Sequence, residues 1–276
     1  ADYYDQWVYP SGAFSLAFNT TWPLRNVANS AARRLPDGGG IADRMTTAYD
    51  ELHESWYSYL PLNGFPPLSP GDPRVAGYFF DWINDHSTRD EYWRQLSLRG
   101  RHHDVDVPVL NVEGWYDVFL AGGIENFLSM RADGGTDAAR AGSRLVIGPW
   151  GHNDWTDRLG DVEFGPEAPR SFPMMAIEWL DHVVKGVPAP RPAPVAYFSM
   201  GDRTWRESQT WPPSEVTPVP LFLGSTGHAG THDGDAAAMP RSPPSAPTTS
   251  GRSRQDPTSS CTRAPRPTIR SGSQEP

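Results

Sequence analysis

Two polar residues, Asp117 and His152, each follow a short apolar segment of the sequence. Asp117 ends the segment VPVLNVEGWYD, and His152 follows the apolar residues 145–147 across a Gly-Pro turn. A histidine can take a proton from a nucleophile and return it to a leaving group, while a carboxylate holds the imidazole in one tautomer. The two residues therefore indicate the base and the acid of nucleophilic catalysis.

The segments that carry these residues are predicted to be strands of a parallel sheet. Each apolar segment has the length of a buried strand, and helical patterns follow at 118–133 and 169–186, the second ending at Gly186. Strands that alternate with helices predict parallel pairing in an α/β domain. Because chemistry in such sheets lies beyond the carboxyl ends of the strands, we expect Asp117 and His152 to lie at the same edge.

The sequence lacks an obvious nucleophile for this pair. In α/β-hydrolases the order is Ser, then Asp or Glu, then His, with the serine in a G-x-S-x-G turn. Asp117 and His152 obey that order, but no such pentapeptide occurs, and Ser225 follows the histidine in a region of β character. Two simpler interpretations stay open: Asp117 as a helix N-cap and His152 as a structural histidine. We favour catalysis because the two residues occur together in this context.

Five segments together resemble the Xaa-Pro dipeptidyl-peptidase-like serine hydrolases, a family that includes cocaine-esterase-like and α-amino-acid ester hydrolases. The segments are WVYPSGAFSLAFNTTW, DWINDHSTRDEYWRQLS, GWYDVFLAGGIENF, RLVIGPWGHNDW and PVAYFSMGDRTWRESQTWPP, and they occur in the family order over roughly residues 3–235. The family's serine and oxyanion tyrosine lie in an N-terminal portion that this sequence does not contain. The resemblance therefore implies a fragment that is inactive alone, because removing a triad member costs several orders of magnitude.

The resemblance also implies a pocket for the acyl group of a substrate. Trp7 and Trp22 match two pocket tryptophans at the family's spacing, and Phe119 matches a third pocket aromatic. Without the resemblance we would assign all three to the core, where aromatic side chains are usually found. Trp150 and Trp155 flank His152 and are expected to shield the base.

The predicted fold class is α/β: the C-terminal part of an α/β-hydrolase fold with a helical cap insertion, followed by the start of a β jelly-roll domain. Helical spacing dominates residues 24–100, with helix starts at Asp72-Pro73 and at Ser87 or Thr88. After a Pro-rich linker, short alternating segments without helices indicate a separate β domain.

The last part of the chain has a different composition. Residues 240–276 carry six Arg against Asp256 and Glu275, with almost no large apolar side chain, which predicts a disordered or frame-shifted tail. The expected divisions are 1–23 (end of the first hydrolase segment and pocket loop), 24–105 (helical cap), 106–190 (core with the Asp and the His), 191–235 (partial jelly roll) and 236–276 (tail).

Composition narrows the set of partners and cofactors. The chain has 276 residues and a net charge of −9, which gives no general attraction to nucleic acid or anionic membranes. One cysteine, Cys261, excludes an intrachain disulfide and favours a reducing, cytoplasmic compartment. We expect no cofactor and no metal. The cluster formed by His102, His103, Asp104 and Asp106 could suggest a metal, but neighbours on an extended segment point to opposite sides.

The predicted function is hydrolysis of a small-molecule ester or amide through an acyl-enzyme, with esterase, amidase and dipeptidyl-peptidase activity all left open. A homo-oligomer is also left open. The alternative is a non-catalytic module that binds carbohydrate or another ligand and presents Trp7, Trp22 and Trp155 as stacking platforms. That alternative predicts β sequence throughout, and the helical patterns at 24–100 and 169–186 argue against it.

Overall fold

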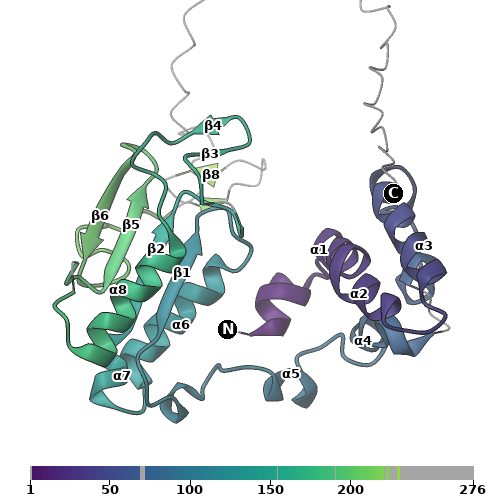
Figure 1. Cartoon of the computed structure of the whole chain (residues 1–276), viewed down its shortest axis with the longest axis horizontal. Helices are drawn as coiled ribbons and strands as arrows, with labels where there is room; N and C mark the ends of the chain where they lie inside the picture. The colour runs from purple at the N-terminus through teal and green to yellow at the C-terminus, as the bar shows by residue number, and fades with distance from the viewer. Residues whose placement is uncertain are drawn as a thin grey trace, which may run out of the picture. The chain divides into compact units, whose positions relative to one another are not determined.

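The structure is a computed structural model that describes residues 2–68, 72–153, 155–189, 191–220, 222–223 and 229–230 (Figure 1). The chain divides into two units after residue 216, and of the second unit the structure describes residues 217–220, 222–223 and 229–230. In the second unit, β7 (Phe222–Leu223) pairs antiparallel with β8 (Ala229–Gly230). The tail predicted at 236–276 and Ser225 lie outside the described residues. No helix in the described ranges has the length and apolar character needed to cross a bilayer.

The first hundred residues are helical and irregular, as the sequence predicts. Asp72 begins α4, because its carboxylate accepts the backbone N–H of Arg74 and Pro73 occupies the first helical position. The expected start at Ser87 or Thr88 is wrong, because the next helix begins only at Glu91 after Asp90. The elements are η1 (Tyr4–Val8), η2 (Pro10–Gly12), α1 (Leu16–Trp22), η3 (Pro23–Val27), α2 (Ala28–Arg33), α3 (Gly39–Asp50), η4 (Leu52–Trp56), η5 (Leu62–Gly64), η6 (Pro66–Leu68), α4 (Pro73–Asn84), α5 (Glu91–Gln95) and η7 (His102–Asp104).

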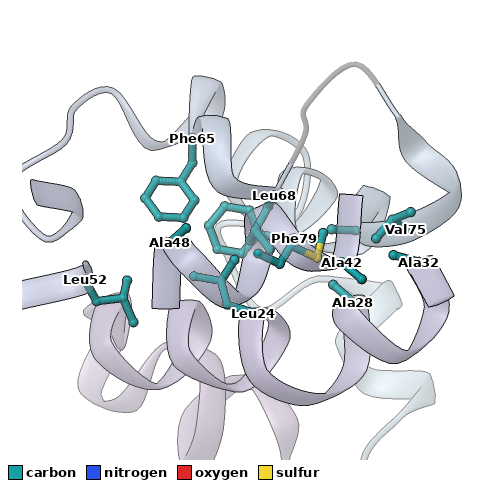
Figure 2. Packing of buried hydrophobic residues seen from close by; sticks show 12 residues of the cluster. Leu24, Ala28, Ala32, Ala42, Ala48, Leu52, Phe65, Leu68, Val75 and Phe79 are labelled. Carbon is teal, nitrogen blue, oxygen red and sulfur yellow. The ribbon is translucent and has the colours of Figure 1, made fainter. Parts of the chain in front are cut away.

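A hydrophobic core holds α2, α3 and α4 together (Figure 2). Phe65 and Phe79 are fully buried in it, and their rings lie 5.9 Å apart. Small residues on α2 and α3, such as Ala28 and Ala42, are also fully buried. Small side chains at these positions let neighbouring helices approach closely while the aromatic rings fill the remaining volume.

Asp117 and His152 follow two strands, β1 and β2, of a four-stranded sheet with the order β1-β2-β5-β6. β1 and β2 pair in parallel, β2 and β5 pair in parallel, and β6 runs antiparallel to β5. This confirms the predicted mixed α/β class with a parallel sheet. The bounds are β1 (Leu110–Gly114), α6 (Leu120–Asp133), α7 (Asp137–Gly142), β2 (Arg144–Gly148), β3 (Arg158–Leu159), β4 (Val162–Glu163), α8 (Phe172–Lys185), β5 (Val195–Ser199) and β6 (Thr204–Ser208).

Helices α6 and α8 cover opposite faces of this sheet (Figure 1). Phe127 of α6 is buried against Leu145 and Ile147, which point to one face of β2. Trp179 of α8 borders the intervening residue, Val146, on the other face. This alternation follows from the two-residue period of a strand. It explains why β2 is apolar at three successive positions, 145–147.

Strands β5 and β6 form where the sequence predicts short alternating strands, but their partner differs from the expectation. Leu145 of β2 is paired with Val195 of β5, so the two strands extend the α/β sheet rather than start a sheet of their own. The helix before them ends as predicted, with Gly186 in the left-handed region at φ 72°.

Candidate active site

Asp117 and His152 lie in two loops that are joined by backbone hydrogen bonds. The N–H of Trp115 donates to the carbonyl of Gly148 (2.8 Å), and the N–H of Tyr116 donates to the carbonyl of Trp150 (3.0 Å). Gly114, at the end of β1, permits this approach, because a Cβ there would lie 2.2 Å from the Trp150 carbonyl oxygen. The loops that follow β1 and β2 are therefore fixed relative to each other.

The side chains of Asp117 and His152 are in direct contact. Asp117 Oδ2 lies 2.9 Å from His152 Nδ1, and the side chain of Asp117 is only 8% exposed, whereas that of His152 is 54% exposed. A carboxylate at Nδ1 favours the tautomer in which Nδ1 carries the proton, so that Nε2 can accept one. The geometry thus presents a basic imidazole nitrogen to a reacting group.

The other oxygen of Asp117 contacts the turn that precedes α6. Asp117 Oδ1 accepts the backbone N–H of Phe119 at 2.8 Å, just before α6 begins at Leu120. Short side chains commonly accept the backbone N–H two residues ahead. One oxygen of this carboxylate therefore supports the turn before α6, whose N-cap is Phe119, and the other contacts His152.

A cavity of about 450 Å³ lies beside this pair. Its lining includes Glu113, Asp117, Phe119 and His152, and also Trp155 and Phe172 from beyond β2. A mainly apolar cavity with a few polar groups is the usual form of a small-molecule site.

Aromatic rings continue outward from His152. Phe119 lies 5.0 Å from the imidazole, Trp7 lies 5.2 Å from Phe119, and Phe18 lies 5.3 Å from Trp7, measured between ring centroids. Trp22 stacks on Phe18 at 6.5 Å. We call Trp7, Phe18, Trp22 and Phe119 the aromatic wall. The structure thus brings Trp7 and Phe119 together near His152, and Trp22 joins them through Phe18.

Phe18 was not selected from the sequence as a site residue. Its position four residues before Trp22 on α1 places both rings on one helix face, and this spacing was the available signal. Trp150 and Trp155 were both expected to shield the base, but only Trp155 lines the cavity. Trp150 is 1% exposed and its Nε1 donates to the carbonyl of Ala168, so it belongs to the core.

Glu113 is a second residue that the sequence did not single out. It lines the cavity beside His152 and an adjoining cavity of about 340 Å³ that also contacts Trp7 and Phe119. Gly123 of α6 makes room for it, since a Cβ at Gly123 would lie 1.7 Å from Glu113 Oε1. Burial, and next the negative charge of Asp117, raise the pKa of Glu113 to about 8.

The raised pKa of Glu113 predicts a pH-dependent stability. The folded chain holds a proton on Glu113 that the unfolded chain releases, so the free energy of unfolding falls as pH rises from about 4.5 to about 8. Replacing Glu113 with Gln is expected to reduce this decline in urea unfolding measured at pH 5, 6, 7 and 8. Glu163→Gln, at a side chain 72% exposed, is the control. Equal pH slopes in wild type and Glu113→Gln would contradict the assignment.

The cluster at residues 102–106 does not gather around one point. His102 is buried and its Nε2 lies 3.0 Å from Asn126 Oδ1, whereas His103 is exposed and faces Asp104. The first three residues of the cluster, His102–Asp104, form a 3-10 turn rather than the extended segment that we expected. Within the described ranges, no group of three or more His, Cys, Asp or Glu side chains has the arrangement of a metal site.

Comparison with known proteins extends these observations. The model of the X-Pro dipeptidyl-peptidase (S15) family matches residues 1–154, which is more than half of the chain. The chain belongs to this family. As an S15 family member, it has a relative in the cocaine esterase of Rhodococcus sp. (strain MB1 Bresler), with 28% identity over 238 residues. That alignment covers 83% of this chain but 39% of the esterase, so the chain spans about two-fifths of the length of this relative.

A solved structure also resembles this S15 family chain. An aminopeptidase from the marine sediment archaeon Thaumarchaeota archaeon matches with a TM-score of 0.50 and 22% identity, over 61% of this chain and 28% of the aminopeptidase. At this level of identity the resemblance concerns the fold, and it agrees with the α/β architecture described above.

Proposed function

We propose that this chain supplies the acid and the base of a Ser-Asp-His triad in a serine acyl hydrolase. Asp117 is the acid and His152 is the base. The observation that carries the proposal is the 2.9 Å contact between Asp117 Oδ2 and His152 Nδ1 at the carboxyl ends of two adjacent parallel strands. Membership of the S15 family supports the same assignment.

In the proposed reaction, His152 Nε2 takes the proton of a serine hydroxyl as the serine attacks the substrate carbonyl. The imidazolium then gives this proton to the leaving alcohol or amine, and an acyl-enzyme forms. His152 next takes a proton from water, which attacks the acyl-enzyme; the imidazolium then returns this proton to the serine oxygen as the acid is released. Asp117 stabilises the imidazolium at Nδ1.

We place the nucleophile in a segment upstream of this sequence, because no G-x-S-x-G pentapeptide occurs in it. Without a serine and an oxyanion hole, the chain on its own is expected to give no hydrolysis above the buffer rate. The finer domain assignment is part of the same proposal: a pocket loop at 1–23, a helical cap at 24–105 and a core at 106–190, whose sheet is extended by β5 and β6.

The aromatic wall is proposed as the binding surface for the acyl group, with Trp7, Trp22 and Phe119 as its principal residues. Its rings extend from His152, so an acyl group whose carbonyl carbon lies near the base would pack against Phe119 first. Apolar and aromatic acyl groups are favoured, because burial of apolar area against aromatic rings stabilises the complex. Small esters or amides are the proposed substrates.

The helices of residues 16–84 do not favour the alternative of an all-β binding module.

Hydrolysis of p-nitrophenyl butyrate tests the proposal, using the chain joined to its upstream segment. His152→Ala is expected to lower kcat at least about 10⁴-fold, since the base is removed. The control is His103→Ala, whose side chain is 68% exposed and lies outside the cavity. Equal rates in wild type and a folded His152→Ala variant would mean that His152 is not the base.

A further inference from the structure

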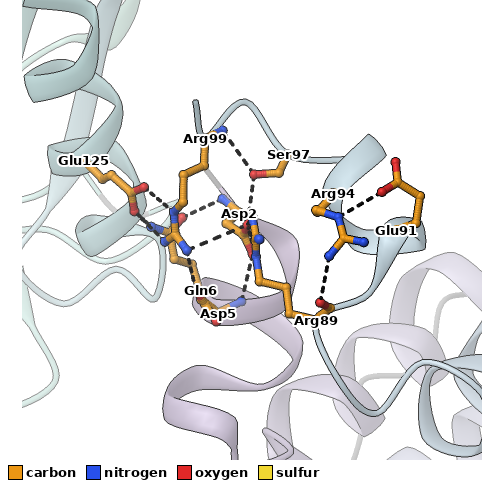
Figure 3. A network of polar contacts seen from close by, with 9 residues as sticks. All are labelled: Asp2, Asp5, Gln6, Arg89, Glu91, Arg94, Ser97, Arg99 and Glu125. Atoms are coloured by element: carbon orange, nitrogen blue, oxygen red, sulfur yellow. Dashed lines mark hydrogen bonds and ion pairs between the residues drawn. The ribbon is translucent and has the colours of Figure 1, made fainter. Parts of the chain in front are cut away.

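A network of charged side chains joins the N-terminal segment to two other parts of the fold (Figure 3). The carboxylate of Asp2 is fully buried and accepts hydrogen bonds from Arg89 at 2.7 Å and from Ser97 at 2.9 Å. Burial alone would raise the pKa of Asp2, but hydrogen bonds from Arg89, the Asp5 N–H and Ser97 hold it below its ordinary value. The start of the chain is therefore fixed to residues 89–97.

Arg99 connects this segment to α6. Its Nε and Nη2 donate to the two carboxylate oxygens of Glu125, at 2.6 and 2.8 Å, and its Nη1 donates to Asp5. Gln6 also donates to Glu125. We call Asp5, Gln6, Arg99 and Glu125 the Arg99 network. Bidentate guanidinium–carboxylate pairs fix relative orientation as well as position.

The Arg99 network holds both residues that precede Trp7. Asp5, Gln6 and Trp7 belong to the same short helical element, η1 (Tyr4–Val8), so fixing the first two also fixes the direction of the third. Trp7 contacts Phe119, and Phe119 contacts His152. An unbroken series of contacts thus leads from Arg99 to the proposed base.

We propose that Arg99 is a positioning residue that sets substrate preference: it clamps η1 against α6 so that Trp7 completes the aromatic wall. This inference rests on the proposed function, because it takes the wall as the acyl site. Substrates with an aromatic acyl group reach Trp7 and depend on the clamp. An acetyl group is too short to pass beyond Phe119 and does not depend on it.

The test compares Arg99→Gln with Arg94→Gln in the chain joined to its upstream segment. Arg94 is a matched control: its guanidinium forms an ion pair with Glu91 and donates to the carbonyl of Arg89, rather than to a residue of η1 (Figure 3). Arg99→Gln is expected to raise KM for p-nitrophenyl phenylacetate about tenfold, because losing one aromatic contact weakens binding by up to about that factor. The kcat for this substrate should change less than about twofold. The kinetics of p-nitrophenyl acetate and of Arg94→Gln should stay at wild-type values.

Two further variants separate positioning from folding. Arg99→Lys keeps the charge but loses the bidentate geometry, so it should raise KM for phenylacetate nearly as much as Arg99→Gln. Glu125→Gln keeps the shape of the acceptor and removes its charge, so it provides the same test if Arg99→Gln does not fold. A parallel loss with both substrates, or an unchanged KM for phenylacetate, would overturn the proposal.

Hydrogen exchange gives a readout that needs no activity. The amides of residues 4–9 are expected to exchange faster in Arg99→Gln than in wild type or Arg94→Gln, because η1 loses its attachment to α6. Unchanged exchange would overturn the clamp even if the triad is correct. Conversely, if His152→Ala stays active, the proposed function fails, while faster exchange in Arg99→Gln would still establish the attachment.

Discussion

Replacing Asp117 with Asn is expected to lower kcat about 10⁴-fold, the size of effect that follows when a triad histidine is held in the wrong tautomer. The structure dictates how this would happen. The N–H of Phe119 needs an acceptor at the position of Oδ1, so the amide oxygen of Asn would occupy that position. The amide NH₂ would then face His152 Nδ1 and donate to it, which leaves the proton on Nε2 and removes the base.

This effect is measured as kcat for p-nitrophenyl butyrate in the chain joined to its upstream segment. KM should stay within about twofold of wild type, because Asp117 acts through the histidine rather than on the ground-state substrate. Asp104→Asn is the control, since that side chain is 54% exposed and pairs with Arg101. A kcat within tenfold of wild type in Asp117→Asn would show that this carboxylate does not orient the base.

Replacing Phe79 with Ala is expected to destabilise the helical region by about 3–5 kcal/mol, the range for removing a large buried aromatic side chain. Phe79 is fully buried near Phe65 (Figure 2). Its ring contacts those of Phe14, Phe65 and Phe80 at centroid distances of 6.0, 5.9 and 5.2 Å. The loss combines the lost burial of the ring with a cavity that rigid aromatic neighbours cannot close.

Urea unfolding followed by circular dichroism at the helical signal measures this change. Leu60→Ala is the control, because Leu60 is 77% exposed and its truncation should change the free energy of unfolding by less than about 0.5 kcal/mol. A loss below about 1 kcal/mol in Phe79→Ala would indicate that this core repacks around the missing ring.

The proximity of Asp117 and His152 could be predicted because it depends on strand topology alone. Two apolar segments separated by a helix predict parallel neighbours, and parallel neighbours bring their carboxyl ends to one edge. Phe18 and Glu113 could not be selected in the same way. Their place beside the site depends on how α1 and α6 pack, and a sequence pattern gives a helix face without giving its neighbour.

Local signals also differed in reliability along the chain. Asp72 followed by Pro73 fixed a helix start correctly, because the capping interaction is made within three residues. Ser87 and Thr88 have the same capping potential, but α5 begins only after Asp90, whose carboxylate pairs with His86. The partner of β5 was not predictable either, because an alternating pattern defines a strand's faces but not the strand beside it.

The backbone hydrogen bonds between the loops after β1 and β2 have a practical consequence for protein engineering. A backbone hydrogen bond connects Tyr116 to Trp150 and holds the two loops together. Asp117 and His152 are therefore in contact within this single chain. A second polypeptide could therefore deliver a serine to a base that is already oriented. The two polypeptides, one with the serine and one with Asp117 and His152, would be suitable as a split reporter. In such a reporter, ester hydrolysis is observed only when two proteins fused to the halves associate.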